Sequence, residues 1–185
     1  TWGVAMGAQR EVSGDTFVEI AGLIETVSIA PENFDHDGNR YAMGVALKRE
    51  IGRVTLSSTL TGGVYSMNNE RRYATGGNSY KAEGDVNGGF FGAEVRASAV
   101  LSGERGYYLK PSAALSYTKA WQDSFSESGA GPLNWNVGAV SEEWVAFTPS
   151  IEMGRAFSTN DRSMLTFVRA GVTAMLNEPS MSLSS

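Results

Sequence analysis

Few residues in this chain have the types and spacing that catalysis requires. Thr1 could act like the nucleophile of an N-terminal hydrolase, but no pattern near it supplies a catalytic partner. His36 lies in Asp35-His36-Asp37, which could bind a metal ion, although a single loop histidine is more often simply solvated. Ser126-Glu127-Ser128 forms no recognisable triad with that one histidine. We therefore predict that the chain is not an enzyme, has no catalytic residues and uses neither a metal nor another cofactor.

Other polar motifs are equally weak evidence for a functional site. Gly129-Ala130-Gly131 resembles part of a phosphate loop, but no Lys-Ser/Thr pair and no helical pattern follow it. The run Asn68-Asn69-Glu70-Arg71-Arg72 fits a solvated surface loop better than a partner site. The net charge of -5 argues against nucleic acid as a partner. The absence of cysteine excludes a thiol nucleophile and a disulfide scaffold.

The strongest pattern is an alternation of apolar and polar residues between Gly106 and Trp121. Alternate positions are apolar or aromatic, with small or polar residues between them: Tyr107, Leu109, Pro111, Ala113, Leu115 and Tyr117. Period two indicates a strand with one apolar and one polar face. Ten residues at roughly 3.3 Å each, tilted by about 40°, span about 25 Å, the height of the apolar band of an outer-membrane barrel. We expect Tyr107 and Tyr117 to lie at the two membrane interfaces.

Seven further segments alternate in the same way. The length of 185 residues is enough for one domain. Their apolar positions cover Trp2–Ala8, Val18–Ile24, Tyr41–Leu47, Val54–Val64, Phe91–Leu101, Val145–Met153 and Val168–Leu176. No run approaches the roughly 20 apolar residues of a membrane-spanning helix. The predicted fold is therefore all-β: an antiparallel up-and-down transmembrane β-barrel of which about eight strands are present.

Predicted connections alternate between short and long, as in barrels with short periplasmic turns and long outer loops. The short ones are Glu11–Asp15, Glu50–Gly52, Ser102–Gly106 and Ser158–Arg162, and the long ones are Ser28–Asn39, Met67–Ser79 and Gln122–Ser141. Charged residues inside the segments fall on the polar face, where we expect them to line a wet lumen: Glu19, Lys48, Arg53, Glu94, Arg96, Lys110, Glu152 and Arg169. One such charge on the lipid face would cost about 2–4 kcal/mol.

Four stretches resemble motifs of autotransporter β-domains. Phe125–Val137 is similar to the family's "F-x-E-x-G-A-x-x-L-x-V" segment, and Tyr108–Tyr117 to its "Y-L-x-P-x-x-x-L-x-Y" strand. Gly63-Val64-Tyr65-Ser66, followed by Arg71-Arg72, resembles a glycine–tyrosine strand end that leads to an arginine. Phe147–Gly154 resembles the "P-x-x-x-x-G" strand. Order and spacing agree over nearly the whole chain.

This resemblance implies the translocator of type V secretion, a twelve-stranded outer-membrane barrel through which an N-terminal passenger of a virulence-type protein reaches the cell surface. The implied partners are outer-membrane lipid, the passenger and the barrel assembly machinery. We expect residues 1–185 to be one partial domain that lacks a pore-threading helix, a first strand and the last strands.

Two alternatives remain open at this stage. The eight strands could close by themselves into a small outer-membrane barrel that acts as an adhesin or structural binding protein through its loops. Bulky residues packed across the inner face, such as Phe90, Tyr108 and Trp144, would favour that reading. An outer-membrane enzyme with a site at the rim is the third and weakest hypothesis.

Overall fold

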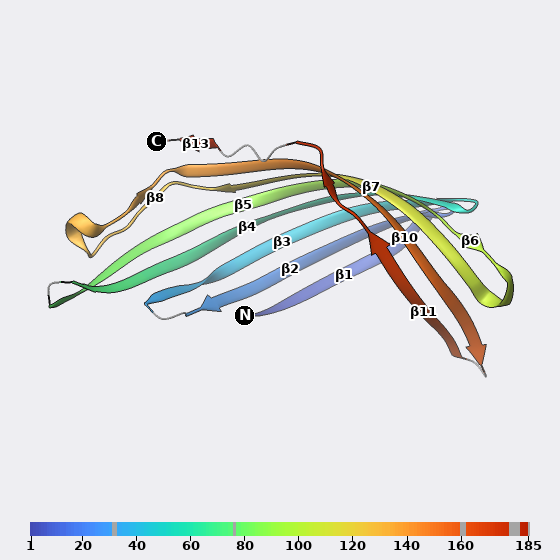
Figure 1. Ribbon diagram of the computed structural model, residues 1–185, viewed down its shortest axis with the longest axis horizontal. Coiled ribbons are helices and arrows are strands. Elements are labelled where there is room, and N and C mark those ends of the chain that lie inside the picture. Colours follow the sequence, from blue (N-terminus) through green and yellow to red (C-terminus); the bar gives the residue numbers. More distant parts are fainter. Residues whose placement is uncertain (31–32, 76, 160–161, 178–181, 185) are drawn as a thin grey trace.

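The protein, a computed structural model that describes residues 1–30, 33–75, 77–159, 162–177 and 182–184, is an antiparallel β-structure (Figure 1). Eight long strands follow one another across a single sheet in the order β1-β2-β3-β4-β5-β7-β10-β11. Their bounds are β1 Trp2–Ser13, β2 Thr16–Ile29, β3 Phe34–Ile51, β4 Val54–Thr75, β5 Asn78–Ala99, β7 Tyr107–Gln122, β10 Ala139–Thr159 and β11 Arg162–Gly171. The eight predicted strands are thus confirmed.

Short elements complete the fold. β6 (Leu101–Ser102) pairs with β7, while β12 (Ala174–Met175) and β13 (Ser182–Ser184) pair with β10. The connection from β7 to β10 contains β8 (Phe125–Ser126), the 3₁₀ turn η2 (Gly131–Leu133) and β9 (Asn136–Val137). A second 3₁₀ turn, η1 (Glu104–Gly106), precedes β7.

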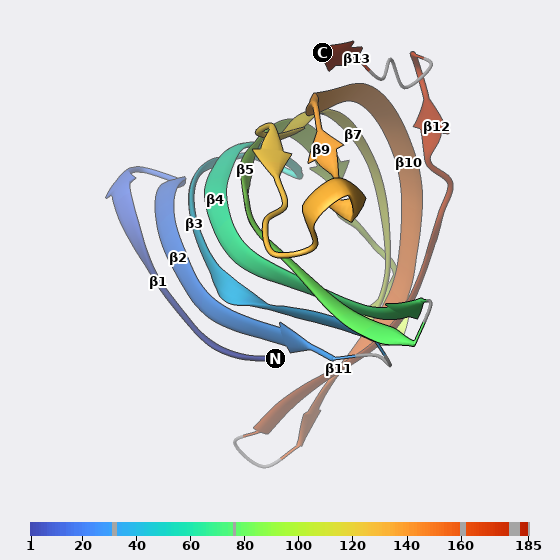
Figure 2. The ribbon, with the colours of Figure 1, turned by 90° about the vertical axis from the view of Figure 1, so that its left-hand side faces the viewer.

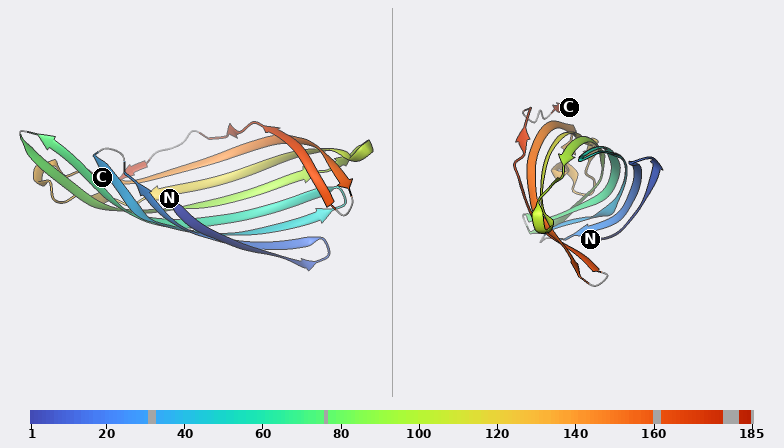
Figure 3. Two further views of the ribbon diagram at one scale, coloured as in Figure 1. Left: turned by 90° about the horizontal axis from the view of Figure 1, so that it is seen from below. Right: turned by 90° about the vertical axis from the view of Figure 1, so that its right-hand side faces the viewer.

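The sheet is strongly curved (Figure 2). Its strands curl around a central space, and the β8–η2–β9 connection lies across one end of that space. Figure 3 shows the same curved wall from below and from the opposite end. Within the described ranges, β1 and β11 end the strand order and do not pair with each other. The described sheet is therefore an open section of barrel wall.

The register places the alternating apolar positions predicted for the eight strands together on the outer face. One cross-strand row, for example, runs Ala8, Ile20, Val45, Leu60, Ala93, Tyr117 and Val145. These side chains do not form a core: Met6 is 76% exposed and Met43 is 70% exposed. Within the described part of the chain, no large side chain is fully buried. An exposed apolar face of this size needs an apolar surrounding, which a bilayer supplies.

Two of the three predicted long loops are wrong. β2 continues to Ile29 and β3 begins at Phe34, while β4 reaches Thr75 and β5 starts at Asn78. Only the connection 123–138 is long. Backbone pairing between neighbouring strands continues through these segments. Phe34 of β3 pairs with Arg71 of β4, and the β4–β5 pairing runs to Thr75 and Asn78. Hydrophobic alternation could not reveal these extensions, because their outer face is polar.

Three smaller corrections concern strand ends. Arg53, predicted within a strand, lies in the turn between β3 and β4. Leu101 belongs to β6, since β5 ends at Ala99. The eighth strand stops at Gly171, short of the predicted Leu176. Its last residue, Gly171, pairs with Ser150, and the next residue of β10 is Pro149, which has no N–H to donate to a ladder, although the Pro149 carbonyl accepts a bond from the Val172 N–H at 3.1 Å.

Asn177 replaces part of the missing ladder. The Val145 N–H donates to Asn177 Oδ1 at 2.6 Å, and Asn177 Nδ2 donates to the Glu143 carbonyl at 3.0 Å. Beside them, the Leu176 N–H donates to the Val145 carbonyl at 2.8 Å. One amide side chain therefore satisfies an N–H and a C=O of β10 as a neighbouring strand would. Each would otherwise be left unpaired at a cost of about 1–3 kcal/mol.

Asn177→Ala should destabilise the edge of β10 by about 2 kcal/mol, because both backbone groups lose their partner. Hydrogen exchange at the Val145 amide, compared with that at a mid-ladder amide such as Leu115, measures the loss. Asn177→Asp is the matched control, because it keeps the acceptor for Val145 and loses only the donor. An unchanged Val145 exchange rate in Asn177→Ala would disprove the role.

Bulky inner residues cover glycines of neighbouring strands. A Cβ placed on Gly154 would lie 2.6 Å from Tyr108 Cε1 and 2.7 Å from the Thr166 carbonyl oxygen. A Cβ on Gly63 would lie 2.6 Å from Phe90 Cε1. Phe90 and Tyr108 therefore pack against the adjacent wall, which does not favour the self-filled small barrel.

Gly154→Ala should destabilise the wall by about 1–3 kcal/mol, since the new methyl group overlaps a ring and a backbone carbonyl that cannot move away. Gly62→Ala is the matched control: its Cβ would meet nothing closer than the Phe90 carbonyl oxygen at 3.6 Å. The temperature at which the folded form unfolds in detergent, followed by its gel mobility, reports the difference. Equal unfolding temperatures for the two variants would contradict this account.

Candidate functional site

The outer face carries an apolar band with defined borders. On β3 the outward residues are apolar from Tyr41 to Leu47, with Asn39 before them and Arg49 after them. On β4 the outward series changes from Val64 to Ser66 at the matching point. On β4 the outward series from Val54 to Val64 covers eleven positions with one polar residue, Ser58, which is about the length that a tilted barrel strand needs to cross hydrocarbon. Tyr107 and Tyr117 lie on the outer face, while their function as interface anchors stays a prediction.

Two outward charges were missed by the sequence reasoning. Lys119 and Glu143 pair across β7 and β10, with Lys119 Nζ 2.6 Å from Glu143 Oε1. Lys119 follows Tyr117 by two residues and Glu143 precedes Val145 by two, so the same period-two rule would have placed both outward. In the register Lys119 lies beside Phe91, in the cross-strand row of Gly62 and Met43, and the mutual ion pair limits the cost of two charges on the outer face.

Beyond the band the wall extends into water. The β4–β5 hairpin reaches past the neighbouring strands (Figure 1), and its outer face is charged. Lys81 Nζ lies 2.8 Å from Glu70 Oε2 and 2.5 Å from Glu83 Oε1. The Lys81 hydrogen bond is the main reason why the pKa of Glu70 is below its usual value. Such a network belongs in solvent, so this end of the wall projects from the membrane.

The inner face holds the other predicted charges. The register puts Glu19, Lys48, Glu94, Arg96, Lys110, Glu152 and Arg169 on the face opposite the apolar band. Most of them are spread along the wall in local pairs: Arg96 Nη2 lies 3.0 Å from Glu94 Oε1, and Lys48 pairs with Glu50. Arg53 is the exception, in its turn. Whether these residues line a pore stays a prediction.

The densest inner cluster is centred on Glu152, which is buried. Tyr108 Oη donates to Glu152 Oε1 at 2.8 Å, and Arg169 pairs with Glu152 Oε2. Lys110 is the cross-strand neighbour of Glu152 on β7. Each oxygen of the carboxylate therefore has its own partner, which fixes three strands, β7, β10 and β11, relative to one another.

A second cluster, which we call the latch, holds the 123–138 connection against β4. Arg71 donates to Glu127 through Nε at 3.3 Å and through Nη2 at 2.6 Å, and Nη2 also reaches the Leu133 carbonyl at 3.1 Å. The Arg71 guanidinium lies 3.8 Å from the centre of the Trp135 ring and 4.9 Å from that of Tyr73. A planar cation between two aromatic rings, paired bidentately, is held in one orientation.

Backbone bonds complete the latch. The Glu83 and Ser128 amides each donate to the other's carbonyl, at 2.9 and 2.8 Å. The Trp135 N–H donates to Glu127 Oε2 at 2.9 Å, and only 1% of the Glu127 side chain is exposed. The Arg71 hydrogen bond, followed by that from Trp135, lowers the pKa of Glu127 despite its burial. The connection is thereby fixed across the mouth of the wall (Figure 2).

The latch joins two of the motifs quoted from the sequence. Arg71 comes from the arginine pair that follows the glycine–tyrosine stretch of β4, and Glu127 from the Phe125–Val137 segment. The sequence showed both motifs but gave no sign that they meet, because 56 positions separate the two residues.

A wall with an apolar outer face, a charged inner face and a fixed loop at its mouth defines the chain as part of a transmembrane β-barrel. No described helix is long and apolar enough to cross a membrane. The family model for the autotransporter beta-domain matches residues 1–183, and the chain belongs to that family. Its location is the outer membrane.

Among solved structures, the chain is similar to the translocator domain of the autotransporter NalP from Neisseria meningitidis, with a TM-score of 0.80 and 18% sequence identity. The match covers 98% of this chain and 62% of that one, so the chain spans less than two thirds of its structural neighbour. At this identity the likeness supports the fold alone. No curated protein sequence matches the chain.

Acid should release the latch. The lowered pKa of Glu127 means that its contribution to stability is complete above the unfolded pKa of about 4.3 and is lost as the pH falls through the lower folded pKa. Exchange at the Glu83 and Ser128 amides, corrected for intrinsic rates, should therefore stay slow at neutral pH and accelerate only below about pH 4.

Glu127→Gln should loosen the 123–138 connection by about 2 kcal/mol at neutral pH and remove the acid dependence, because the charged partner of Arg71 is gone. Asp85→Asn, which changes an exposed carboxylate on the same hairpin outside the latch, is the control and should leave exchange at Ser128 unaltered. Wild-type exchange that shows no acid response would refute the assignment.

Proposed function

We propose that this wall is part of a translocator barrel that lets its own N-terminal passenger polypeptide cross the outer membrane to the cell surface. The observation that supports this proposal most strongly is that the outer and inner faces of the sheet have opposite chemistry. The apolar band suits lipid, and the concave face offers water-compatible groups along its length. Passage of a chain through such a lumen breaks no bond, so the proposal requires no catalytic residue and no cofactor.

The inner surface suits passage better than binding. Its charges are of both signs and are largely satisfied by wall neighbours, such as Arg96 by Glu94 and Arg169 by Glu152. Hydroxyl side chains lie between them, including Ser57, Thr59 and Ser116. Charges that are already paired bind a passing segment weakly, and a conduit must release what enters it.

The open edges of β1 and β11 bear on the size of the domain. Unpaired strand edges are not tolerated in hydrocarbon, because their N–H and C=O groups have no partner there. We propose that further strands of the same protein complete a twelve-stranded barrel, and that the outer-membrane assembly machinery inserts it. The 62% coverage of the NalP domain supports this proposal.

Cysteine scanning tests the function in the full-length protein, because residues 1–185 contain no cysteine. Thr59 and Leu60 are adjacent on β4 but point to opposite faces. With the passenger stalled in transit by a folded fusion, Thr59→Cys should cross-link to a passenger cysteine, whereas Leu60→Cys should not. Cross-linking from Leu60→Cys, or from neither position, would reject a lumenal route.

A further inference from the structure

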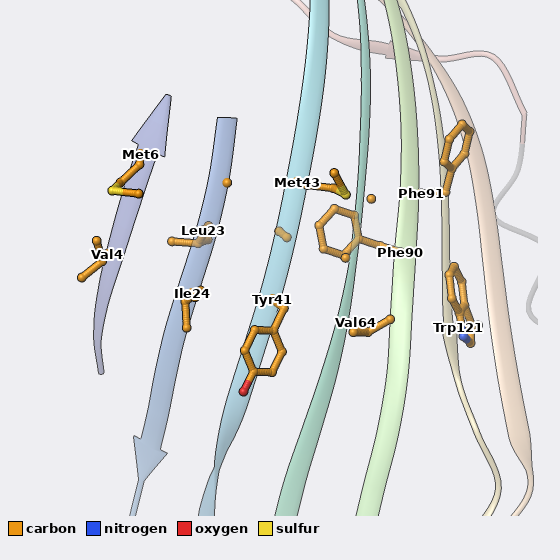
Figure 4. A pocket seen from close by; sticks show the side chains of 14 residues that line it. Val4, Met6, Leu23, Ile24, Tyr41, Met43, Val64, Phe90, Phe91 and Trp121 are labelled. Atoms are coloured by element: carbon orange, nitrogen blue, oxygen red, sulfur yellow. The ribbon is translucent and has the colours of Figure 1, made fainter. Parts of the chain in front are cut away.

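The outer face is hollowed across its first strands. An apolar groove of about 780 Å³ runs across the strands from β1 to β7 (Figure 4). Most of its lining side chains point outward. One cross-strand row forms its length, namely Met6, Gly22, Met43, Gly62 and Phe91. The row alternates large and small residues, so gaps over Gly22 and Gly62 separate flexible or aromatic ridges.

Packing within the protein leaves room for a larger side chain at both of these glycines. A Cβ on Gly22 would lie 3.9 Å from the nearest atom, and one on Gly62 would lie 3.6 Å from it. Elsewhere in the wall the opposite holds: a Cβ on Gly89 would lie 2.6 Å from Trp121 Cζ2. Gly89 makes room for a side chain of the protein itself, whereas Gly22 and Gly62 leave open space on the lipid side.

The position of the groove along the membrane normal follows from the border of the apolar band. The end of the groove nearest the polar border includes Ile24, Tyr41, Val64 and Trp121. Two residues beyond Tyr41 and Val64 the outward positions become Asn39 and Ser66, where the apolar band ends. This border is on the side of the 123–138 connection and the projecting β4–β5 hairpin. Longer connections mark the outer side of such barrels, so the groove lies at the depth of the outer leaflet.

We propose that the groove is a binding site for one acyl chain of an outer-leaflet lipid. It is continuous with the membrane-facing apolar band, so lipid is the material that meets it. Within hydrocarbon the gain comes from packing, not from leaving water, so a chain seated between two walls contacts more atoms than one lying on a flat surface.

The lining residues suit a chain of variable shape. Methionine side chains are flexible and polarisable and adapt to irregular apolar ligands. Met6 and Met43, the two on the groove row, are also among the most exposed side chains of the sheet. Tyr41 and Trp121 stand at the border of the band, where aromatic rings with one polar atom favour the interface. The seated chain would thus extend from the border down into the leaflet.

The test fills the groove and measures retained lipid. Full-length protein, extracted in mild detergent from its membrane, is analysed by native mass spectrometry. Wild type should keep one lipid through detergent exchange. Gly22→Leu with Gly62→Leu should lower the retained lipid by about tenfold, which corresponds to about 1.4 kcal/mol.

Two variants keep the test decisive. Ala97→Leu adds a branched apolar side chain on the outer face of β5, away from the groove, and should leave retention unchanged. Gly62→Ala fills the gap only partly and should lower retention to an intermediate degree, which guards against a folding failure of the double variant. Equal retention in wild type and filled variants, or equal loss in Ala97→Leu, would overturn the site. Passenger display, scored in the same cells, judges the translocator proposal separately.

Discussion

The constraint on which this structure depends is that no backbone polar group can remain unpaired in hydrocarbon. Every long strand is held to its neighbours by an antiparallel ladder, and the ladder alone carries the chain across the membrane. Where the ladder fails, the chain compensates locally: Pro149 cannot donate, β11 ends one residue before the position that faces it, and the side-chain amide of Asn177 bonds to backbone groups further along β10. The fold thus depends on pairing and not on a buried core.

Because the ladder pairs the backbone N–H and C=O groups, the side chains are not needed for that pairing and can give each face its own chemistry. The outer face is apolar and then becomes polar where the strands leave the membrane. The inner face carries charges that neutralise one another, as at Glu152, and small hydroxyl groups between them. The latch adds a third feature, in which the Arg71–Glu127 pair fixes a loop that would otherwise be free at the mouth. Together these features give a stable wall with a wet interior.

Much of this was predictable from particular residues. The run from Tyr107 to Tyr117 and its seven companions located all eight strands, and their phase separated the two faces. The Phe125–Val137 segment indicated the family, which the family match confirms. Three of the errors share one cause: the β4–β5 extension, Lys119 and Glu143 were missed because the interpretation followed hydrophobic alternation and ended where the outer face became polar. A backbone ladder has no such limit.

The sequence by itself determined which residues face lipid, because the two-residue period of a strand is a local property of the chain. It could not determine which residues far apart in the chain come into contact in the folded sheet. Arg71 and Glu127 lie 56 positions apart, Asn177 and Val145 32 apart, and the glycine gaps at Gly22 and Gly62 align only through the register of three strands, β2, β3 and β4. These contacts depend on register and curvature, which arise from the whole sheet, so only the tertiary structure decided them.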